Sequence, residues 1–288
     1  FVGHGPHIAF PIFELDKFTR SEKYQLKNVD AVITCSEWGK SIVESETKRQ
    51  AIPGVANQHA HLWPDEISTP CYVVPLGYDP KIFSKKPITG HTTNFLLNGK
   101  IEIRKCTKEI LDAFNSAFTP EDDVRLYLCW GNIFLTEKET SEWVRYAQSL
   151  TIAPRLTIVP RLDSIKQVSE LLGTVDCVVS MSRAEGFNLG LLEALASSRH
   201  VIGTNNTAQT EFLSSRNAQL IETPELCVAL DPKWFKGEDF DGEPGKWAKI
   251  GKTQINELIS HMRTIHQCKQ LGKLEINQEG LETAKKFT

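Results

Sequence analysis

Two glutamates, Glu185 and Glu193, stand in a segment that could bind hydroxyl groups. The segment follows an apolar run, residues 175–179, that is typical of a buried parallel strand. Glu185 then falls in a glycine-containing turn, and Glu193 falls about one turn inside a helix with Leu189 and Leu192 on its apolar face. This edge of an open α/β sheet is where ligands bind, since helix N-termini offer free N–H groups to phosphate. Two carboxylates there would accept hydrogen bonds from sugar or ribose hydroxyls.

Two lysines follow another strand-like run, residues 94–97, and could bind a diphosphate. Lys100 comes directly after Gly99, and Lys105 comes five positions later. A glycine turn with two cations suits phosphate oxygens, which form charge-assisted hydrogen bonds with such groups. Exposed loop lysines are the alternative interpretation of both residues.

Further groups could complete such a site. Gly186, Phe187 and Asn188 would present backbone N–H groups at the start of the helix that carries Glu193. Arg161 follows a strand-like run and could stack on a nucleobase, although an ordinary surface arginine is equally compatible with its context.

The sequence contains no convincing metal cluster, and no cofactor is expected. His59 and His61 with Asp65 come nearest, but they lie in a stretch rich in proline, histidine and glycine that indicates a surface loop. The seven cysteines are far apart and mostly in apolar runs, which predicts reduced thiols in a cytoplasmic protein.

The composition excludes several classes of protein. With 40% hydrophobic and 24% charged residues, the 288-residue chain is typical of globular proteins. Its net charge of -3 and the lack of a long basic block argue against nucleic-acid binding. No apolar run reaches the roughly 18 residues of a transmembrane helix. The basic residues between 17 and 27 favour a solvated face, and a peripheral membrane contact is the alternative.

Strand-like apolar runs alternate with helical patterns along the chain. The patterns predict strands at residues 8–13, 31–35, 71–74, 94–97, 124–130, 156–159, 175–179, 200–203 and 218–221. They predict helices at residues 19–28, 36–46, 107–117, 137–149, 164–172, 189–197, 209–213 and 253–268. This alternation indicates an α/β fold with doubly wound parallel sheets and right-handed crossovers.

A polar stretch with Pro80, Pro87 and Gly90 predicts a boundary that divides the chain into residues 1–85 and 86–288. The first part has only three clear strands, fewer than a domain usually needs, so we expect it to be incomplete. The chain begins with Phe1 and ends in a helical pattern, and we interpret both ends as cut.

The pattern Ser-x-x-Glu-Gly-Phe-x5-Glu-Ala, which contains Glu185 and Glu193, resembles the donor-site motif of retaining GT-B glycosyltransferases of family 4. Residues 73–83 are similar to the interdomain stretch of that family, and residues 30–36 to its last N-terminal strand. The resemblance implies a GT-B fold of two Rossmann-like sheets. Residues 1–85 would be a partial acceptor-side domain, and residues 86–288 the nucleotide-sugar-binding domain with the start of a C-terminal helix.

The resemblance also implies a reaction and gives roles to residues. The chain would be a metal-independent, retaining hexosyltransferase that moves a sugar from a nucleotide-diphosphate donor to a glycan, lipid or other small acceptor. Glu193 would bind ribose hydroxyls, Glu185 the transferred sugar and Lys105 the diphosphate. Lys100 replaces the arginine of the family, and Cys106 replaces a glycine.

Glu14 stands where many members of the family have a histidine near the leaving group, so it is a candidate catalytic residue. The alternative is that Glu14 satisfies backbone groups at a helix start. For the whole chain, the alternative function is a nucleotide-sugar-binding fragment or module without turnover. More remote alternatives on the same scaffold are an epimerase or a phosphorylase.

Overall fold

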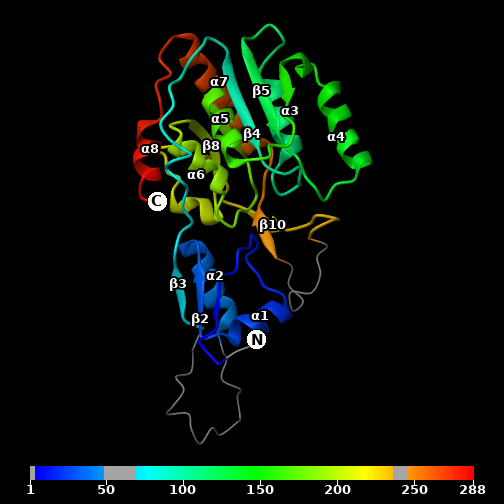
Figure 1. Ribbon diagram of the computed structural model, residues 1–288. Coiled ribbons are helices and arrows are strands. Elements are labelled where there is room, and N and C mark those ends of the chain that lie inside the picture. Colours follow the sequence, from blue (N-terminus) through cyan, green and yellow to red (C-terminus); the bar gives the residue numbers. More distant parts are fainter. Residues whose placement is uncertain (1–3, 49–68, 236–244) are drawn as a thin grey trace, which may run out of the picture.

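The computed structural model describes residues 4–48, 69–235 and 245–288. His59, His61 and Asp65 lie outside these ranges. Within them the chain forms two parallel sheets, one above the other in Figure 1, and a short antiparallel hairpin beside the place where they meet. The α/β class and the parallel, doubly wound arrangement are confirmed.

The larger sheet has six parallel strands in the order β6-β5-β4-β7-β8-β9. These strands are β4 (Thr93–Asn98), β5 (Val124–Cys129), β6 (Leu156–Ile158), β7 (Cys177–Ser180), β8 (His200–Asn205) and β9 (Gln219–Glu222). The strand order reverses between β4 and β7, so the loops that leave these two neighbours diverge to opposite sides. That divergence opens a crevice at the carboxyl edge of the sheet.

Helices cover both faces of this sheet (Figure 1). On one face lie α3 (Thr107–Ala117), α4 (Glu137–Ser149) and α7 (Lys252–Gln270), and on the other lie α5 (Ile165–Thr174), α6 (Leu189–Ala196) and α8 (Gln278–Ala284). Successive residues of β4 alternate between the two cores: Phe95 and Leu97 pack toward the first group, and Leu96 toward the second. Burial on both faces explains the continuous apolar runs that predicted these strands.

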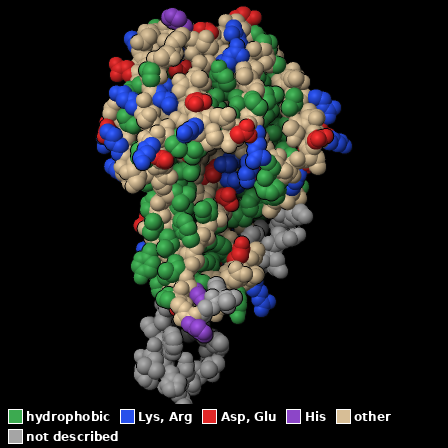
Figure 2. All heavy atoms as spheres, viewed as in Figure 1, with side chains coloured by type: hydrophobic (Ala, Val, Ile, Leu, Met, Phe, Trp, Pro, Cys, Tyr) green, Lys and Arg blue, Asp and Glu red, His purple; other side chains and the backbone are tan. Residues whose placement is uncertain are grey.

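The smaller sheet has three parallel strands, β1 (Ile8–Ala9), β2 (Ala31–Thr34) and β3 (Cys71–Val73). The helices α1 (Arg20–Lys27) and α2 (Glu37–Thr47) pack around a core that includes Leu26, Val32 and Val43. Thr19 caps α1 and Ser36 caps α2, the residues at which the predicted ranges 19–28 and 36–46 begin. Hydrophobic side chains of this lower part also reach the surface, as Figure 2 shows.

Three local predictions were wrong. The strand expected over residues 8–13 ends at Ala9, since Pro11 lacks an N–H for the sheet and the chain leaves the edge toward the larger sheet. The helix expected over 209–213 is a 3-10 helix, η3 (Thr207–Glu211). The helical pattern at the C-terminal end stops at Ala284, and Phe287 instead packs against Phe187 and Phe212.

The hairpin of β10 (Leu226–Val228) and β11 (Lys246–Ala248) was not predicted. It matters for the site because Trp247 packs in a small core with Leu15. The backbone N–H of Lys246 also donates to the Asp16 carboxylate at 2.6 Å. These two contacts hold the segment that follows β1 beneath the larger sheet. The boundary predicted after residue 85 falls between β3 and β4, and it stays a prediction.

The central strand of the larger sheet provides a test of the core. Phe95 is fully buried and packs against Phe114 and Phe118, so Phe95→Ala should lower the free energy of unfolding by about 3–5 kcal/mol. Urea denaturation measures the loss. Ile133→Ala is the control: this side chain is 68% exposed, and we expect a change below about 0.5 kcal/mol. Equal losses in the two variants would contradict the packing described.

Candidate active site

A cavity of about 640 Å³ opens at the carboxyl edge of the larger sheet, between β4 and β7. Its walls come from five segments of the chain: the loop after β4, the loop before α5 with the start of that helix, the β7–α6 turn with the start of α6, and the segments after β1 and after β3. In Figure 2 basic and acidic side chains gather in a hollow between the upper and lower parts of the molecule. The crevice predicted from the strand order is therefore a cavity lined by charged groups.

The β7–α6 turn is held in one conformation by its own side chains. Asn188 has a φ of 69°, in the left-handed region that asparagine tolerates better than most residues. Its side-chain amide donates to Ser180 Oγ at 3.0 Å and to Gln209 Oε1 at 2.7 Å. Beside it, the backbone N–H of Glu185 donates to Thr207 Oγ1 at 2.9 Å. The turn is therefore fixed from β7 and from η3 before any ligand arrives.

Gly186 packs directly against the segment that follows β1. A Cβ at this position would lie 2.7 Å from Ile12 Cγ2 and 3.1 Å from the Phe13 carbonyl oxygen. The Cys35 thiol donates to the Gly186 carbonyl at 2.8 Å. Only glycine fits between these groups.

The backbone N–H groups of Gly186, Phe187 and Asn188 donate to no backbone acceptor among the described residues. All three residues line the cavity, together with the first residues of α6, so free N–H groups and a helix N-terminus face it. The Phe187 ring itself is buried against Phe212 and Phe287. Only the backbone of Phe187 is thus left to serve the cavity, and its role in binding stays a prediction.

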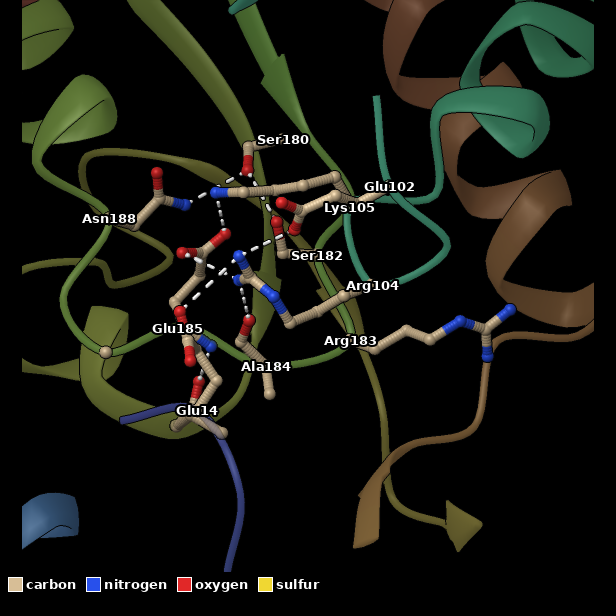
Figure 3. A network of polar contacts seen from close by, with 12 residues as sticks. Glu14, Glu102, Arg104, Lys105, Ser180, Ser182, Arg183, Ala184, Glu185 and Asn188 are labelled. Carbon is tan, nitrogen blue, oxygen red and sulfur yellow. Dashed lines mark hydrogen bonds and ion pairs between the residues drawn. The ribbon is translucent and has the colours of Figure 1, made fainter. Parts of the chain in front are cut away.

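Glu185 is a buried carboxylate neutralised by two cations (Figure 3). Lys105 Nζ lies 2.5 Å from its Oε1, and Arg104 Nη1 lies 3.3 Å from its Oε2. Burial by itself would raise the pKa of Glu185, but the charges of Lys105 and Arg104 outweigh it and the pKa is lowered. Glu185 is therefore ionised at neutral pH.

Glu193 is in the opposite electrostatic situation. It lines the cavity from the first turns of α6, is only 8% exposed, and its carboxylate has no hydrogen-bond or ion-pair partner among the described residues. Burial raises its pKa from 4.5 to about 7. An unpaired, buried acceptor of this kind is poised to receive donors from a ligand.

The two predicted lysines are not brought together. Lys105 lines the cavity, but Lys100 Nζ lies 3.9 Å from Glu102 Oε1 and 5.3 Å from the centre of the Phe134 ring, outside the cavity lining. Cys106, next to Lys105, has a φ of 51° and is fully buried. A positive φ places this backbone in the left-handed region, which glycine adopts without the steric cost that cysteine has.

Of the other predicted residues, Glu14 lines the cavity and Arg161 does not. Leu15 and Asp16, anchored on the β10–β11 hairpin, place Glu14 below Glu185. Arg161 is exposed, and its neighbour Leu162 forms the wall instead. Arg104 was not predicted as a site residue, although it stands beside Lys105 in a loop with three cations. That density of charge was the signal available.

Among residues 4–48, 69–235 and 245–288, no group of histidine, cysteine, aspartate and glutamate could hold a metal ion. Within the same residues no helix has the length and apolar character needed to span a membrane.

The family model described as "Glycosyl transferases group 1" matches residues 93–230, which run from β4 to just beyond β10. No curated protein sequence matches the chain. Many solved structures share its fold, among them the following three. Sucrose-phosphate synthase from Thermosynechococcus elongatus has a TM-score of 0.63 at 16% identity, and the match covers 92% of this chain and 56% of that protein.

Anabaena Alr3699/HepE, solved in complex with UDP and glucose, has a TM-score of 0.68 at 14% identity, over 98% of this chain and 67% of that one. The C-terminal domain of a group 1 family glycosyl transferase, LpcC from Francisella tularensis, has a TM-score of 0.54 at 17% identity, over 73% of this chain and 97% of that domain. The chain thus has the fold of GT-B glycosyltransferases. Together, the family match and these neighbours support the group 1 glycosyltransferase family.

The raised pKa of Glu193 predicts how stability depends on pH. The native state holds a proton on this group up to about pH 7, while the unfolded chain loses it near pH 4.5. The contribution of this residue to the free energy of unfolding therefore decreases as the pH rises from about 4.5 to about 7. Glu193→Gln removes the penalty and should make the unliganded protein more stable by roughly 2–3 kcal/mol at pH 8, with little difference at pH 4.

Urea unfolding at several pH values measures this difference. Glu170→Gln, at an exposed position of α5, is the control and should follow the unmodified protein across the pH range. If the free energy of unfolding of Glu193→Gln changes with pH in the same way as that of the control, Glu193 is not desolvated.

Proposed function

We propose that the chain takes part in transfer of a sugar from a nucleotide-diphosphate sugar, with retention of configuration and without a metal ion. The observation that carries this proposal is Glu193, a buried carboxylate that lines the cavity with no partner among the described residues. A ribose diol offers two hydroxyl donors to one carboxylate, and a nucleotide held in this way would extend its diphosphate toward Lys105.

The diphosphate would be held by charge and dipoles. Lys105 supplies the positive charge, and the N–H groups from Gly186 to Asn188 at the start of α6 supply hydrogen-bond donors. As the bond to the sugar breaks, negative charge grows on the departing phosphate, and these preorganised groups stabilise it. This arrangement lets the chain neutralise the leaving group with its own residues.

Glu185 and Glu14 would face the transferred sugar and the acceptor. Glu185 lies at the cavity wall beside Lys105, where it can accept hydrogen bonds from sugar hydroxyls. Glu14 lines the same cavity from the segment after β1, and its carboxylate lies 3.5 Å from Arg104 Nη2. With retention, the acceptor hydroxyl would approach on the face that the diphosphate leaves, and the departing phosphate oxygen would take its proton. A hexose donor and a glycan, lipid or other small acceptor remain part of the proposal.

Donor binding tests the proposal directly. Calorimetric titration with UDP-, GDP- and ADP-sugars in the presence of EDTA should give binding to one of them, unchanged by the chelator. UDP is the first choice, since the Anabaena neighbour was solved with UDP. A well-folded protein that binds none of these donors would contradict the proposal. Release of free nucleotide on addition of acceptors then separates transfer from binding without turnover.

Lys105→Ala should weaken the diphosphate donor about 10- to 100-fold and the corresponding nucleoside less than about twofold, because the side chain would contact only phosphate. Titration with donor and with nucleoside measures both effects. Lys108→Ala is the control, since Lys108 pairs with Asp112 on the exposed side of α3. Equal losses for donor and nucleoside would remove Lys105 from a phosphate role.

A further inference from the structure

Arg104 is buried beneath the cavity, at 6% exposure, with acidic groups around its guanidinium (Figure 3). Its Nη1 donates to the Ala184 carbonyl at 2.8 Å and lies 3.3 Å from Glu185 Oε2. Its Nη2 lies 3.0 Å from Glu102 Oε2 and 3.5 Å from Glu14 Oε1. The planar fork of arginine allows one side chain to meet these four acceptors at once.

Each carboxylate oxygen of Glu185 thus pairs with a different cation, and the two cations differ in how freely their side chains can move. Lys105 lines the cavity with a side chain that is 19% exposed, so its ammonium can turn toward a ligand. Arg104 does not line the cavity and is fixed by four partners. A diphosphate in the cavity would compete with Glu185 for Lys105. If Lys105 were the only cation on Glu185, that exchange would leave a buried carboxylate unpaired, which is strongly unfavourable.

We propose that Arg104 is a positioning residue that keeps Glu185 paired and in place while Lys105 turns from Glu185 to the diphosphate of the donor. The proposal rests on the function proposed above and adds a residue to it. It also gives a role to the contact with Glu14, which ties the guanidinium to the segment after β1. Donor capture and the placement of that segment then depend on the same side chain.

The test uses UDP as probe, or GDP or ADP if one of these binds the unmodified protein instead. In Arg104→Met, Lys105 is the remaining cation that pairs with Glu185, so Glu185 should hold it more strongly. The affinity for UDP should fall about tenfold, and the affinity for uridine should change less than about twofold. In the double variant Arg104→Met/Glu185→Gln nothing retains Lys105, and the affinity for UDP should return to within about threefold of Glu185→Gln alone.

This rescue separates positioning from a general structural role. A folding defect caused by the loss of the Arg104 contacts with Glu14 and Glu102 would persist in the double variant, and a direct contact of Arg104 with phosphate would not be replaced by Glu185→Gln. Either an unchanged affinity for UDP in Arg104→Met or a double variant as weak as Arg104→Met would overturn the proposal.

Arg183→Met is the matched control. Arg183 belongs to the same buried region, but its guanidinium pairs with Glu109 at 2.9 Å and points away from Glu185 in Figure 3. Its removal can lower the melting temperature yet should leave the affinity for UDP within about twofold. A loss of affinity equal to that of Arg104→Met would assign the effect to the region and not to the Glu185–Lys105 pair.

A second measurement needs no nucleotide and separates this proposal from the proposed function. Reductive methylation with formaldehyde and cyanoborohydride, followed by peptide mass spectrometry, reports the availability of the Lys105 amine in the free protein. We expect slower methylation of Lys105 in Arg104→Met and faster methylation in the double variant. If UDP, GDP and ADP all fail to bind, the proposed function fails, and the methylation rates still decide whether Arg104 controls Lys105. Equal rates in all variants would overturn the proposal.

Discussion

The charge of Glu185 is the constraint on which the rest of the site depends. A buried carboxylate in the turn that follows a buried strand is unstable unless cations reach it. Both cations come from the loop after β4, because β4 and β7 are neighbours in the sheet. The reversal of strand order is therefore what makes the buried charge tolerable, and it opens the cavity at the same place.

The same edge also joins the two sheets. The Cys35 thiol meets the Gly186 carbonyl, the N–H of Glu37 donates to Glu211 Oε1 at 2.6 Å, and Asp16 accepts from Lys246. Each contact joins the smaller sheet to a loop beyond the carboxyl edge of the larger sheet or to the hairpin beside it. The segments that position Glu14 thus pack against the segments that position Glu185.

Most of the fold could be predicted from the sequence because a parallel sheet buried on both faces requires continuous apolar runs, and capping residues such as Thr19 and Ser36 mark the helix starts. The β10–β11 hairpin could not, since its strands are three residues long and far apart in sequence. For the site, the sequence identified Glu185, Glu193 and Lys105 as cavity residues through their local context.

The positions of Lys100 and Arg104 could not be predicted in that way. Both stand in the same loop, and which cation turns inward is decided by acceptors from distant segments: the Ala184 carbonyl, Glu185 and Glu14. The sequence shows which residues are charged, but it does not show which buried acceptors will lie near each of them in the fold. The left-handed backbone at Cys106 is a similar case, since the residue type gave no sign of that conformation.

The solitary Glu193 carboxyl also makes the cavity a source of protons. With a pKa of about 7, part of the protein holds a proton on Glu193 at neutral pH when no ligand is bound. A ligand whose hydroxyls prefer the ionised form would release that proton on binding. The heat of binding would then include the ionisation heat of whatever buffer accepts the proton. Two buffers of different ionisation enthalpy would report different binding enthalpies for one and the same complex.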